Sequence, residues 1–326
     1  MTDGAETHPA AGAGLSAVRM FAAGGPLGFG TGFLHHAGDR AVCVRLLREA
    51  FDAGVTYYDT ARLYGEGACE TMLAEAFAGK RSEVFLATKV GILPPQWTLG
   101  ARISAKAAHI MRKAPPLRAV VAEPEDRHPV FGVFDRPRMQ ASFEASLKAL
   151  KTDHVDLLLL HECTLEDVQR DEVQHFLGQM VRDGKAKAWG VAPTPEAMLG
   201  IAHSGVAYGE VAQFDGAIRS GFPPEGAPSP ALIITHSCLG EGFREMAARL
   251  QQDEVLKARW SAALGLDAGD PGVVAQAFLA RAMQQNPGGI VLFSTTRDDR
   301  LRRNLEAASW LDMPDRMAAL PGILPG

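Results

Sequence analysis

Short apolar runs alternate with amphipathic segments along most of this 326-residue chain, and this alternation constrains its fold more than any other feature. Short apolar runs predict buried strands, and apolar residues at helical spacing predict helices. Apolar strands separated by helices are typical of a parallel sheet that is covered on both faces. The predicted strands lie at 26–32, 56–59, 84–88, 155–161, 186–191, 211–214, 232–235 and 290–293.

The predicted helices fall between these strands. They lie at 39–53, 68–77, 139–150, 172–182, 195–202, 273–285 and 298–309. About eight strand–helix repeats favour a closed barrel over an open doubly wound sheet. The glycine-rich run at 26–32 does not fit the G-x-G-x-x-G spacing of a Rossmann fold. The sequence therefore predicts an α/β protein with a (β/α)8 TIM barrel.

The alternation is interrupted once, after the third predicted strand. Residues 91–137 contain several prolines and no clear strand, and a short helix is predicted near 104–111. Apolar residues are mixed there with Arg102, Lys106 and Arg112. A loop this long in a compact domain is usually functional or disordered. We expect a lid-like insertion in a single barrel domain spanning 18–326, with a disordered insertion as the alternative.

Composition argues against secreted, nucleic-acid-binding, membrane-spanning and disulfide-rich proteins. Residues 1–17 are rich in Gly and Ala and lack the basic start and apolar run of a signal peptide, which predicts a flexible leader and a cytoplasmic protein. The net charge of −5 gives no global signal for nucleic-acid binding. No apolar stretch approaches the length of a membrane span. The four cysteines form no CxxC pair, which indicates reduced thiols. Nothing in the sequence indicates an oligomeric state.

Polar residues stand at the ends of the predicted strands. Asp59, Lys89 and His161 end the second to fourth strands, and Tyr64 lies in the loop after Asp59. In a barrel of this kind the carboxyl ends of the strands meet at one mouth, where the chemistry takes place. A lysine that ends so apolar a strand needs a nearby anion, and Asp59 is the expected partner of Lys89. The later strands add Gln213, His236 and Ser294 to the same mouth.

Five segments, three of which contain Asp59, Tyr64, Lys89 or His161, are similar to motifs of a known family. With them the chain resembles the aldo-keto reductase superfamily from about Gly25 to Ala308. The resemblance implies a barrel fold and an extended nicotinamide dinucleotide as cofactor. It also implies reduction of an aldehyde or ketone to an alcohol, or the reverse reaction as an alcohol or sugar dehydrogenase. The matching segments are 51–61 with Tyr64-Gly65, Ala87-Thr88-Lys89, 155–161, 184–191 and 300–304.

The resemblance carries the family's catalytic tetrad onto Asp59, Tyr64, Lys89 and His161. Tyr64 is then the general acid that protonates the developing alkoxide. A phenol ordinarily has a pKa of about 10, and the Lys89 ammonium is expected to lower the pKa of Tyr64 toward working pH. Asp59 holds Lys89, and His161 donates a hydrogen bond to the carbonyl oxygen of the substrate.

The cofactor-binding residues follow from the same resemblance, with departures. Arg297 and Arg300 would hold a 2′-phosphate, so NADP(H) is the preferred cofactor and NAD(H) remains possible. His236 replaces the family's usual aromatic, Ala192-Pro193 replaces Ser-Asn, and Arg303 stands where Glu is frequent. The full predicted set is Gln213, His236, Ser237, Leu239, Ser294, Thr295, Arg297, Arg300 and Asn304.

Two other functions stay open. A zinc-dependent barrel hydrolase could use His161, Cys163, His236 and Cys238 as ligands, although Lys89 would be an unfavourable neighbour for a cation. A non-catalytic nucleotide-binding subunit would keep the tetrad but turn over poorly, and Ala192-Pro193 and His236 favour it. Metal analysis tests the first alternative, and cofactor oxidation with a panel of aldehydes tests the second. The preferred interpretation assigns no metal to the site.

Overall fold

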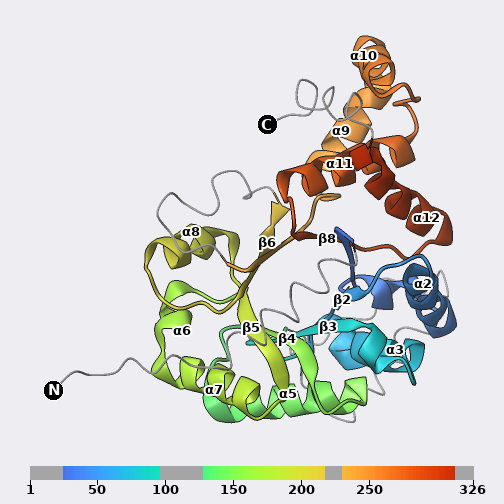
Figure 1. Cartoon of the computed structure of the whole chain (residues 1–326). Helices are drawn as coiled ribbons and strands as arrows, with labels where there is room; N and C mark the ends of the chain where they lie inside the picture. Colours follow the sequence, from blue (N-terminus) through green and yellow to red (C-terminus); the bar gives the residue numbers. More distant parts are fainter. Residues whose placement is uncertain (1–24, 96–127, 217–229, 313–326) are drawn as a thin grey trace, which may run out of the picture.

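The strands of this protein form a closed parallel barrel. The computed structural model describes residues 25–95, 128–216 and 230–312. Each strand pairs with the next along the chain, and the last strand pairs with the first (Figure 1). The strands are β1 (Leu27–Gly30), β2 (Tyr57–Asp59), β3 (Phe85–Val90), β4 (Val155–His161), β5 (Ala186–Ala192), β6 (Val211–Asp215), β7 (Leu232–His236) and β8 (Ile290–Phe293). The predicted (β/α)8 TIM barrel is confirmed.

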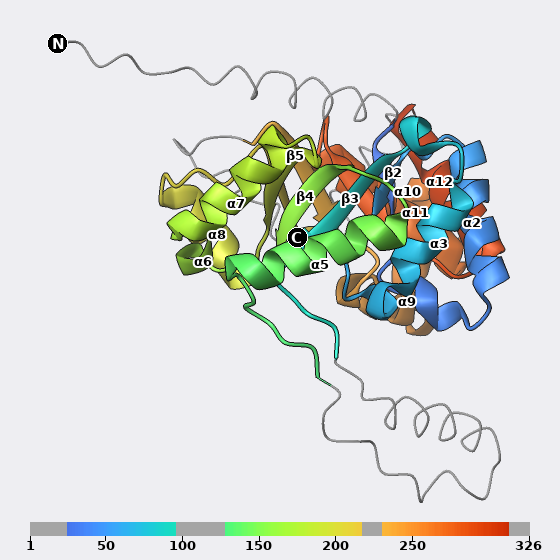
Figure 2. The same cartoon turned by 90° about the horizontal axis from the view of Figure 1, so that it is seen from below.

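Helices surround the barrel on its outer side (Figures 1 and 2). The α-helices are α2 (Arg40–Asp52), α3 (Ala68–Ala76), α5 (Arg136–Leu150), α6 (Leu165–Gln169), α7 (Asp171–Arg182), α8 (Pro195–His203), α9 (Glu241–Gln252), α10 (Glu254–Leu264), α11 (Pro271–Gln285) and α12 (Asp298–Glu306). Short 3-10 helices are η1 (Leu34–Ala37), η2 (Tyr64–Gly67), η3 (Arg81–Glu83) and η6 (Ala307–Asp312). No helix of the described ranges is both long and apolar enough to cross a bilayer.

Several helices differ from the sequence-based prediction. Helices α6, α9 and α10 occupy stretches in which no element was predicted, and α10 lies at the edge of the molecule in Figure 1. Helix α5 begins at Arg136, inside the predicted 91–137 insertion, because the Asp135 side chain accepts a hydrogen bond from the backbone N–H of Arg138. Pro137 lies in the first turn, where a helix needs no backbone donor. Pro137, which was predicted to lie in a loop, therefore lies in the first turn of α5.

The barrel interior is filled by side chains of alternate strand residues. Tyr57 and Phe85 stack there with their ring centroids 5.0 Å apart. Gly28 makes room for this stack, because a Cβ at that position would lie 2.8 Å from a Tyr57 ring atom. On β3, Phe85 and Ala87 belong to the interior cluster, whereas Leu86 and Val90 belong to the layer under the helices. The alternation therefore points Lys89 into the barrel and Thr88 toward the helices.

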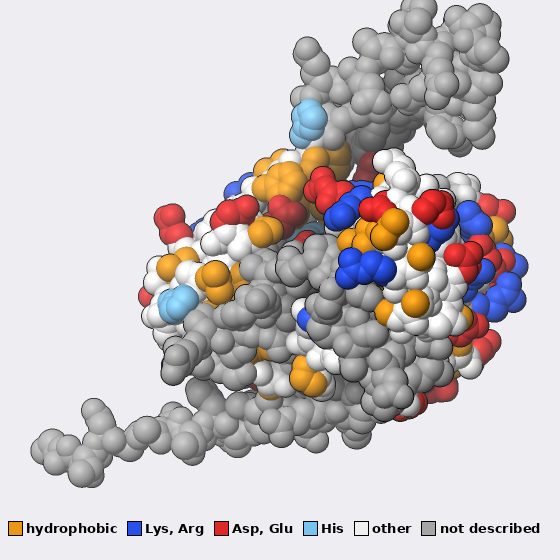
Figure 3. Space-filling view, turned by 90° about the horizontal axis from the view of Figure 1, so that it is seen from above, with side chains coloured by type: hydrophobic (Ala, Val, Ile, Leu, Met, Phe, Trp, Pro, Cys, Tyr) orange, Lys and Arg blue, Asp and Glu red, His pale blue; other side chains and the backbone are white. Residues whose placement is uncertain are grey.

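The inserted segment leaves and re-enters the barrel at neighbouring points. Leu93 and Val130 form an antiparallel bridge, with backbone N–O distances of 2.9 and 3.0 Å. The predicted helix at 104–111, most of the predicted lid and the predicted leader at 1–17 lie outside the described residues. On the face shown in Figure 3, basic and acidic side chains lie side by side rather than gathering by sign.

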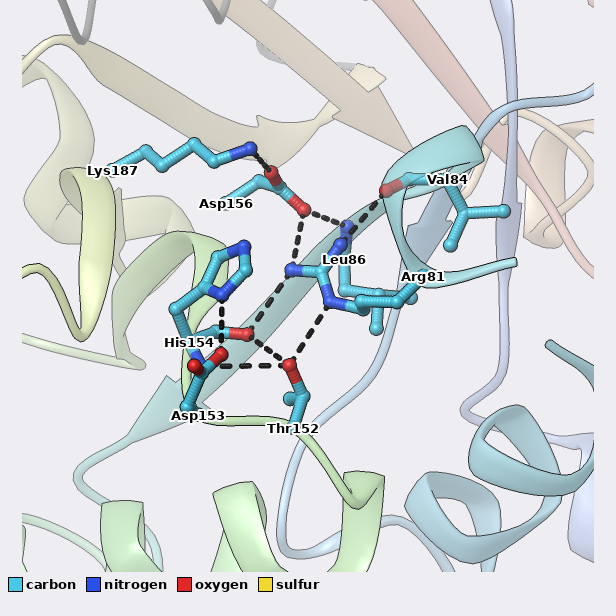
Figure 4. Close-up of polar contacts among 8 residues, drawn as sticks. All are labelled: Arg81, Val84, Leu86, Thr152, Asp153, His154, Asp156 and Lys187. Atoms are coloured by element: carbon cyan, nitrogen blue, oxygen red, sulfur yellow. Dashed lines mark hydrogen bonds and ion pairs between the residues drawn. The ribbon is translucent and has the colours of Figure 1, made fainter. Parts of the chain in front are cut away.

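A buried carboxylate ties β3, β4 and β5 together near the amino ends of these strands (Figure 4). The Asp156 side chain is wholly buried, and it accepts a hydrogen bond from the backbone N–H of Leu86 at 2.8 Å. Its oxygens also lie 2.8 Å from Arg81 and 2.6 Å from Lys187. Arg81 further donates to the carbonyl oxygens of Val84 and His154. This network lies at the end of the barrel that is remote from the strand ends Asp59, Lys89 and His161.

We expect Asp156→Ala to destabilise the fold without changing the mouth of the barrel. The substitution leaves the buried backbone N–H of Leu86 without its acceptor, which costs about 1–3 kcal/mol, and the partly exposed Arg81 and Lys187 lose their shared anion. The free energy of unfolding from urea denaturation measures the loss. Asp153→Asn is the control, because Asp153 is exposed and, within the part of the chain that the structure describes, forms an ion pair only with its neighbour His154. Equal stability of Asp156→Ala and the wild type would contradict the structural role of Asp156.

Candidate active site

The loop after β2 carries two of the predicted site residues in an unusual backbone conformation. Asp59 is the last residue of β2, and Tyr64 begins the short helix η2. Gly65, Glu66 and Gly67 follow with φ angles of 57°, 56° and 88°. For the non-glycine Glu66 this left-handed conformation costs about 1 kcal/mol or more. The loop must therefore be held by contacts, and these place the Tyr64 side chain.

Lys89 is the centre of the site and contacts both ends of this loop. Its Nζ lies 2.6 Å from Asp59 Oδ1 and donates to the Thr60 carbonyl oxygen at 3.0 Å. The same Nζ donates to the Tyr64 hydroxyl oxygen at 3.3 Å. The Lys89 side chain is almost wholly buried, so the ammonium depends on these partners for its charge. The predicted partnership of Asp59 with Lys89 is present in the structure.

His161 completes the predicted group of four. It ends β4, and its ring meets the Tyr64 ring edge-on, with centroids 5.8 Å apart and planes at 90°. Asp59, Tyr64, Lys89 and His161 are thus brought together at one mouth from β2, the loop after it, β3 and β4. The sequence reading missed the Thr60 carbonyl as a partner of Lys89, because side-chain patterns carry no signal for main-chain acceptors.

Burial and charge set the protonation of this group. Burial raises the pKa of Tyr64, and the opposing effect of Lys89 does not cancel it. Burial alone would lower the pKa of Lys89, but Asp59 and Tyr64 outweigh it and the pKa is raised. Burial, followed by the charges of Lys89 and His236, holds the pKa of His161 well below its usual value. At neutral pH the site therefore contains a phenol, an ammonium ion and a neutral imidazole.

One expectation about Tyr64 is wrong in its net direction. The sequence reading expected the ammonium to bring the phenol pKa down toward working pH. Lys89 does act in that direction, but desolvation of Tyr64 is the larger effect. The sequence predicts that Lys89 lies near Tyr64. It does not predict how deeply the assembled barrel buries Tyr64, and that burial decides the direction of the pKa shift.

Of the residues predicted to bind the nicotinamide end of a cofactor, Gln213 and His236 lie at the mouth. Gln213 is buried on β6, and among the described residues its Oε1 has no hydrogen-bond partner. His236 is the last residue of β7, and its charge contributes to lowering the pKa of His161. His236 also contacts Ser237 Oγ at 2.8 Å through Nδ1. Leu239 packs against the hydrophobic layer under the helices.

The predicted phosphate-binding residues lie after β8 and on α12. Ser294 donates to the Gly30 carbonyl oxygen, and the Thr295 hydroxyl accepts from the Arg297 backbone N–H at 3.2 Å. Arg297 is already paired with Asp299 at 2.6 Å. Arg300 has no ion pair with any described residue. Asn304 is buried on the same helix.

The charge of Arg303, which stands where the resemblance expects Glu, is compensated within the fold. Its guanidinium lies 2.6 Å from Asp270, the N-cap residue of α11. Gly272 permits this contact, because a Cβ there would lie 2.0 Å from Arg303 Nη1. Among the arginines predicted to read a phosphate, only Arg300 is left without a carboxylate partner in the described ranges.

The zinc-site alternative finds no support in the geometry. Within the described residues, no three His, Cys, Asp or Glu side chains gather as metal ligands. Cys163 is buried in the hydrophobic layer under the helices, where desolvation raises the pKa of its thiol to about 12. His161 instead faces the mouth beside Tyr64. Strand and loop geometry thus separates the proposed ligands.

Comparison with known protein families gives one clear match. The model of the aldo/keto reductase family matches residues 26–206, more than half of the chain. The methylglyoxal reductase YeaE of Escherichia coli is 28% identical over 167 residues, which cover 51% of this chain and 44% of that protein. The 6-dehydroglucose reductase of Agrobacterium fabrum is 31% identical over 142 residues, covering 43% and 39%. The chain thus spans less than half the length of these curated relatives.

Solved structures show the same fold at low sequence identity. An aldo-keto reductase of Bacillus halodurans in its holo form has a TM-score of 0.64 and 17% identity, covering 92% of each chain. An aldo/keto reductase of Klebsiella pneumoniae in complex with NADP and acetate has a TM-score of 0.60 and 21% identity. That alignment covers 92% of this chain and 91% of the other.

We expect Lys89→Met to destabilise the fold by about 3–5 kcal/mol, because it leaves the buried Asp59 carboxylate without its cation. The double variant Asp59→Asn with Lys89→Met should recover most of this loss, because neither charge then remains buried. Urea denaturation of the wild type, both single variants and the double variant measures the coupling between the two residues. Strictly additive losses would show that the two side chains do not depend on each other.

Proposed function

The chain belongs to the aldo/keto reductase family, and from that premise we propose that it is a nicotinamide-dependent oxidoreductase. It reduces an aldehyde or ketone to an alcohol, or catalyses the reverse reaction on an alcohol or sugar. The observation that supports this most directly is the hydrogen bond from Lys89 to the Tyr64 hydroxyl, beside the ring of His161. A phenol held by a buried ammonium is a suitable proton donor for a developing alkoxide.

The residues at the mouth suit a nicotinamide dinucleotide. The unpartnered Gln213 Oε1 is a buried acceptor that a carboxamide N–H would satisfy. At the other end, Arg300 offers a guanidinium that pairs with no carboxylate of the described residues and is therefore available to a phosphate. A bound reduced nicotinamide supplies a hydride to the carbonyl carbon. Gln213 and His236 would hold its ring end, and Ser294, Thr295, Arg300 and Asn304 its phosphate end.

The chain's own groups then handle the proton. Tyr64, protonated because burial raises its pKa, donates its hydroxyl proton to the carbonyl oxygen as negative charge develops there. Lys89 stabilises the phenolate that remains, and Asp59 keeps Lys89 protonated. His161, neutral at physiological pH, can donate an N–H hydrogen bond to the same oxygen and so orient the carbonyl group. In the reverse direction the Tyr64 phenolate accepts the proton of the alcohol.

The substrate class is also a proposal. The relatives reported above are named for the reduction of methylglyoxal and of 6-dehydroglucose. Both names describe small polar carbonyl compounds, so we expect a small aldehyde, ketone or sugar-derived carbonyl compound. The wild-type protein should oxidise NADPH in the presence of at least one member of such a panel. NADPH binding without any turnover across the panel would favour the non-catalytic nucleotide-binding alternative.

We expect Tyr64→Phe to abolish carbonyl reduction while leaving NADPH binding nearly intact. The change removes the hydroxyl but keeps the ring that packs against His161. Loss of a positioned general acid typically lowers the rate by about 10²–10⁴-fold. Steady-state kinetics measures kcat, and fluorescence titration measures the Kd for NADPH. A turnover within about threefold of the wild type would rule out Tyr64 as the proton donor.

A second expectation concerns cofactor choice. Arg300→Ala should weaken NADPH binding by about 1–3 kcal/mol, because a charge-assisted hydrogen bond to the 2′-phosphate is lost. NADH binding should change little. Arg302→Ala is the matched control, since Arg302 lies on the same helix and is also exposed. Parallel titrations with NADPH and NADH decide the matter, and equal losses for both cofactors would show that Arg300 does not read the 2′-phosphate.

A further inference from the structure

A further buried carboxylate, distinct from Asp59 and Asp156, lies behind the site and contacts none of the four residues in it. Glu70 is on α3, and its side chain has no exposed surface. Its Oε2 lies 3.1 Å from Arg62 Nη1, and its Oε1 accepts a hydrogen bond from the Thr88 hydroxyl at 3.1 Å. A charged group that is fully removed from water is rare in proteins unless it is paired. The burial of Glu70 therefore indicates that its contacts with Arg62 and Thr88 have a structural or functional role.

The two partners of Glu70 lie close in sequence to two of the site residues. Arg62 precedes Tyr64 by two positions in the loop after β2, and Thr88 precedes Lys89 on β3. Because successive strand residues face opposite sides, Thr88 points outward to Glu70 while Lys89 points into the barrel. Glu70 thus joins the backbone that carries the phenol to the backbone that carries the ammonium.

The loop that carries Tyr64 is built around the Arg62 contact. Gly67 has a φ of +88°, and a Cβ there would lie 1.8 Å from Arg62 Nη1. The guanidinium therefore occupies the space that a side chain at position 67 would fill on its way to Glu70. Glu66, the non-glycine residue between Gly65 and Gly67, also has a positive φ and needs outside contacts to hold it. Loss of the Arg62 contact would release the loop two residues before Tyr64.

We propose that the Arg62–Glu70 ion pair is a positioning device that sets the Tyr64 hydroxyl against Lys89 Nζ. The inference rests on the proposed function, in which that contact prepares the proton donor. The Lys89–Tyr64 distance of 3.3 Å is long for a hydrogen bond, so a small displacement of the loop breaks it. Misplacement by about 1 Å can lower a rate by about 10²-fold. Arg62 and Glu70 do not touch the reacting groups and are positioning residues.

The test compares Glu70→Gln with Glu75→Gln in the full-length protein. Glu75 is also on α3, but its pair with Arg40 is exposed, so it is the matched control. We expect Glu70→Gln to lower kcat at least about tenfold, with the KM for the carbonyl substrate and the Kd for NADPH within about threefold of wild type. Glu75→Gln should match the wild type in all three quantities.

A second readout does not depend on turnover. The chain has four tyrosines, so a 13C-tyrosine NMR spectrum is simple, and Tyr64→Phe identifies the Tyr64 resonance. At fixed neutral pH this resonance should shift in Glu70→Gln, because the hydrogen bond from Lys89 is lost, and should stay in place in Glu75→Gln. If the wild type reduces no carbonyl compound, the proposed function fails, while this shift still decides whether Glu70 positions Tyr64.

Arg62 provides an independent pair of variants if Glu70→Gln does not fold, because its side chain is partly exposed. Arg62→Met should reproduce the loss in kcat and the shift of the Tyr64 resonance. Arg62→Lys keeps the positive charge and should restore part of both. The proposal is overturned if Glu70→Gln and Arg62→Met only lower the denaturation midpoint and leave the Tyr64 resonance and kcat unchanged.

Discussion

The buried pair of Lys89 and Asp59 is the interaction on which the mouth of this barrel depends. An ammonium ion in an apolar interior is costly unless an anion and further acceptors surround it. Asp59 provides the anion, and the Thr60 carbonyl oxygen and the Tyr64 hydroxyl provide the acceptors. The same three contacts fix the start of the loop that follows β2. The contacts that compensate the Lys89 charge are therefore the same contacts that place the Tyr64 hydroxyl.

Much of this arrangement could be predicted from the sequence, because it depends on order and alternation. Apolar strands that recur between helices indicate a parallel barrel, and the last residues of β2, β3 and β4 then share one rim. Helices α9 and α10 could not be read in the same way, since no strand follows them closely to complete a repeat. The start of α5 was missed because prolines were taken as loop residues, although Pro137 suits the first turn of a helix.

The pKa shift of Tyr64 and the ion pairs of the arginines were less predictable than the positions of these residues. Spacing indicated that Lys89 would act on Tyr64, but the net direction of the Tyr64 pKa follows from how deeply the assembled barrel buries the ring. Likewise, the arginines near α12 were identified from sequence, whereas their pairing was not. Asp299 engages Arg297, and Asp270 engages Arg303 from a different helix. Contacts between distant elements, such as Asp270 with Arg303, leave no local pattern in the chain.

The bridge between Leu93 and Val130 has a consequence for how this barrel can change during evolution. The bridge fixes both ends of the intervening chain beside β3 and α5. Lengthening the chain between two ends that are held together raises the entropic cost of closing the loop only logarithmically, by about 0.6 kcal/mol for each doubling of its length. Residues can therefore be gained, lost or exchanged between these two anchor points at little cost to the barrel. The bridge makes this position a permissive insertion point directly beside the strand that carries Lys89.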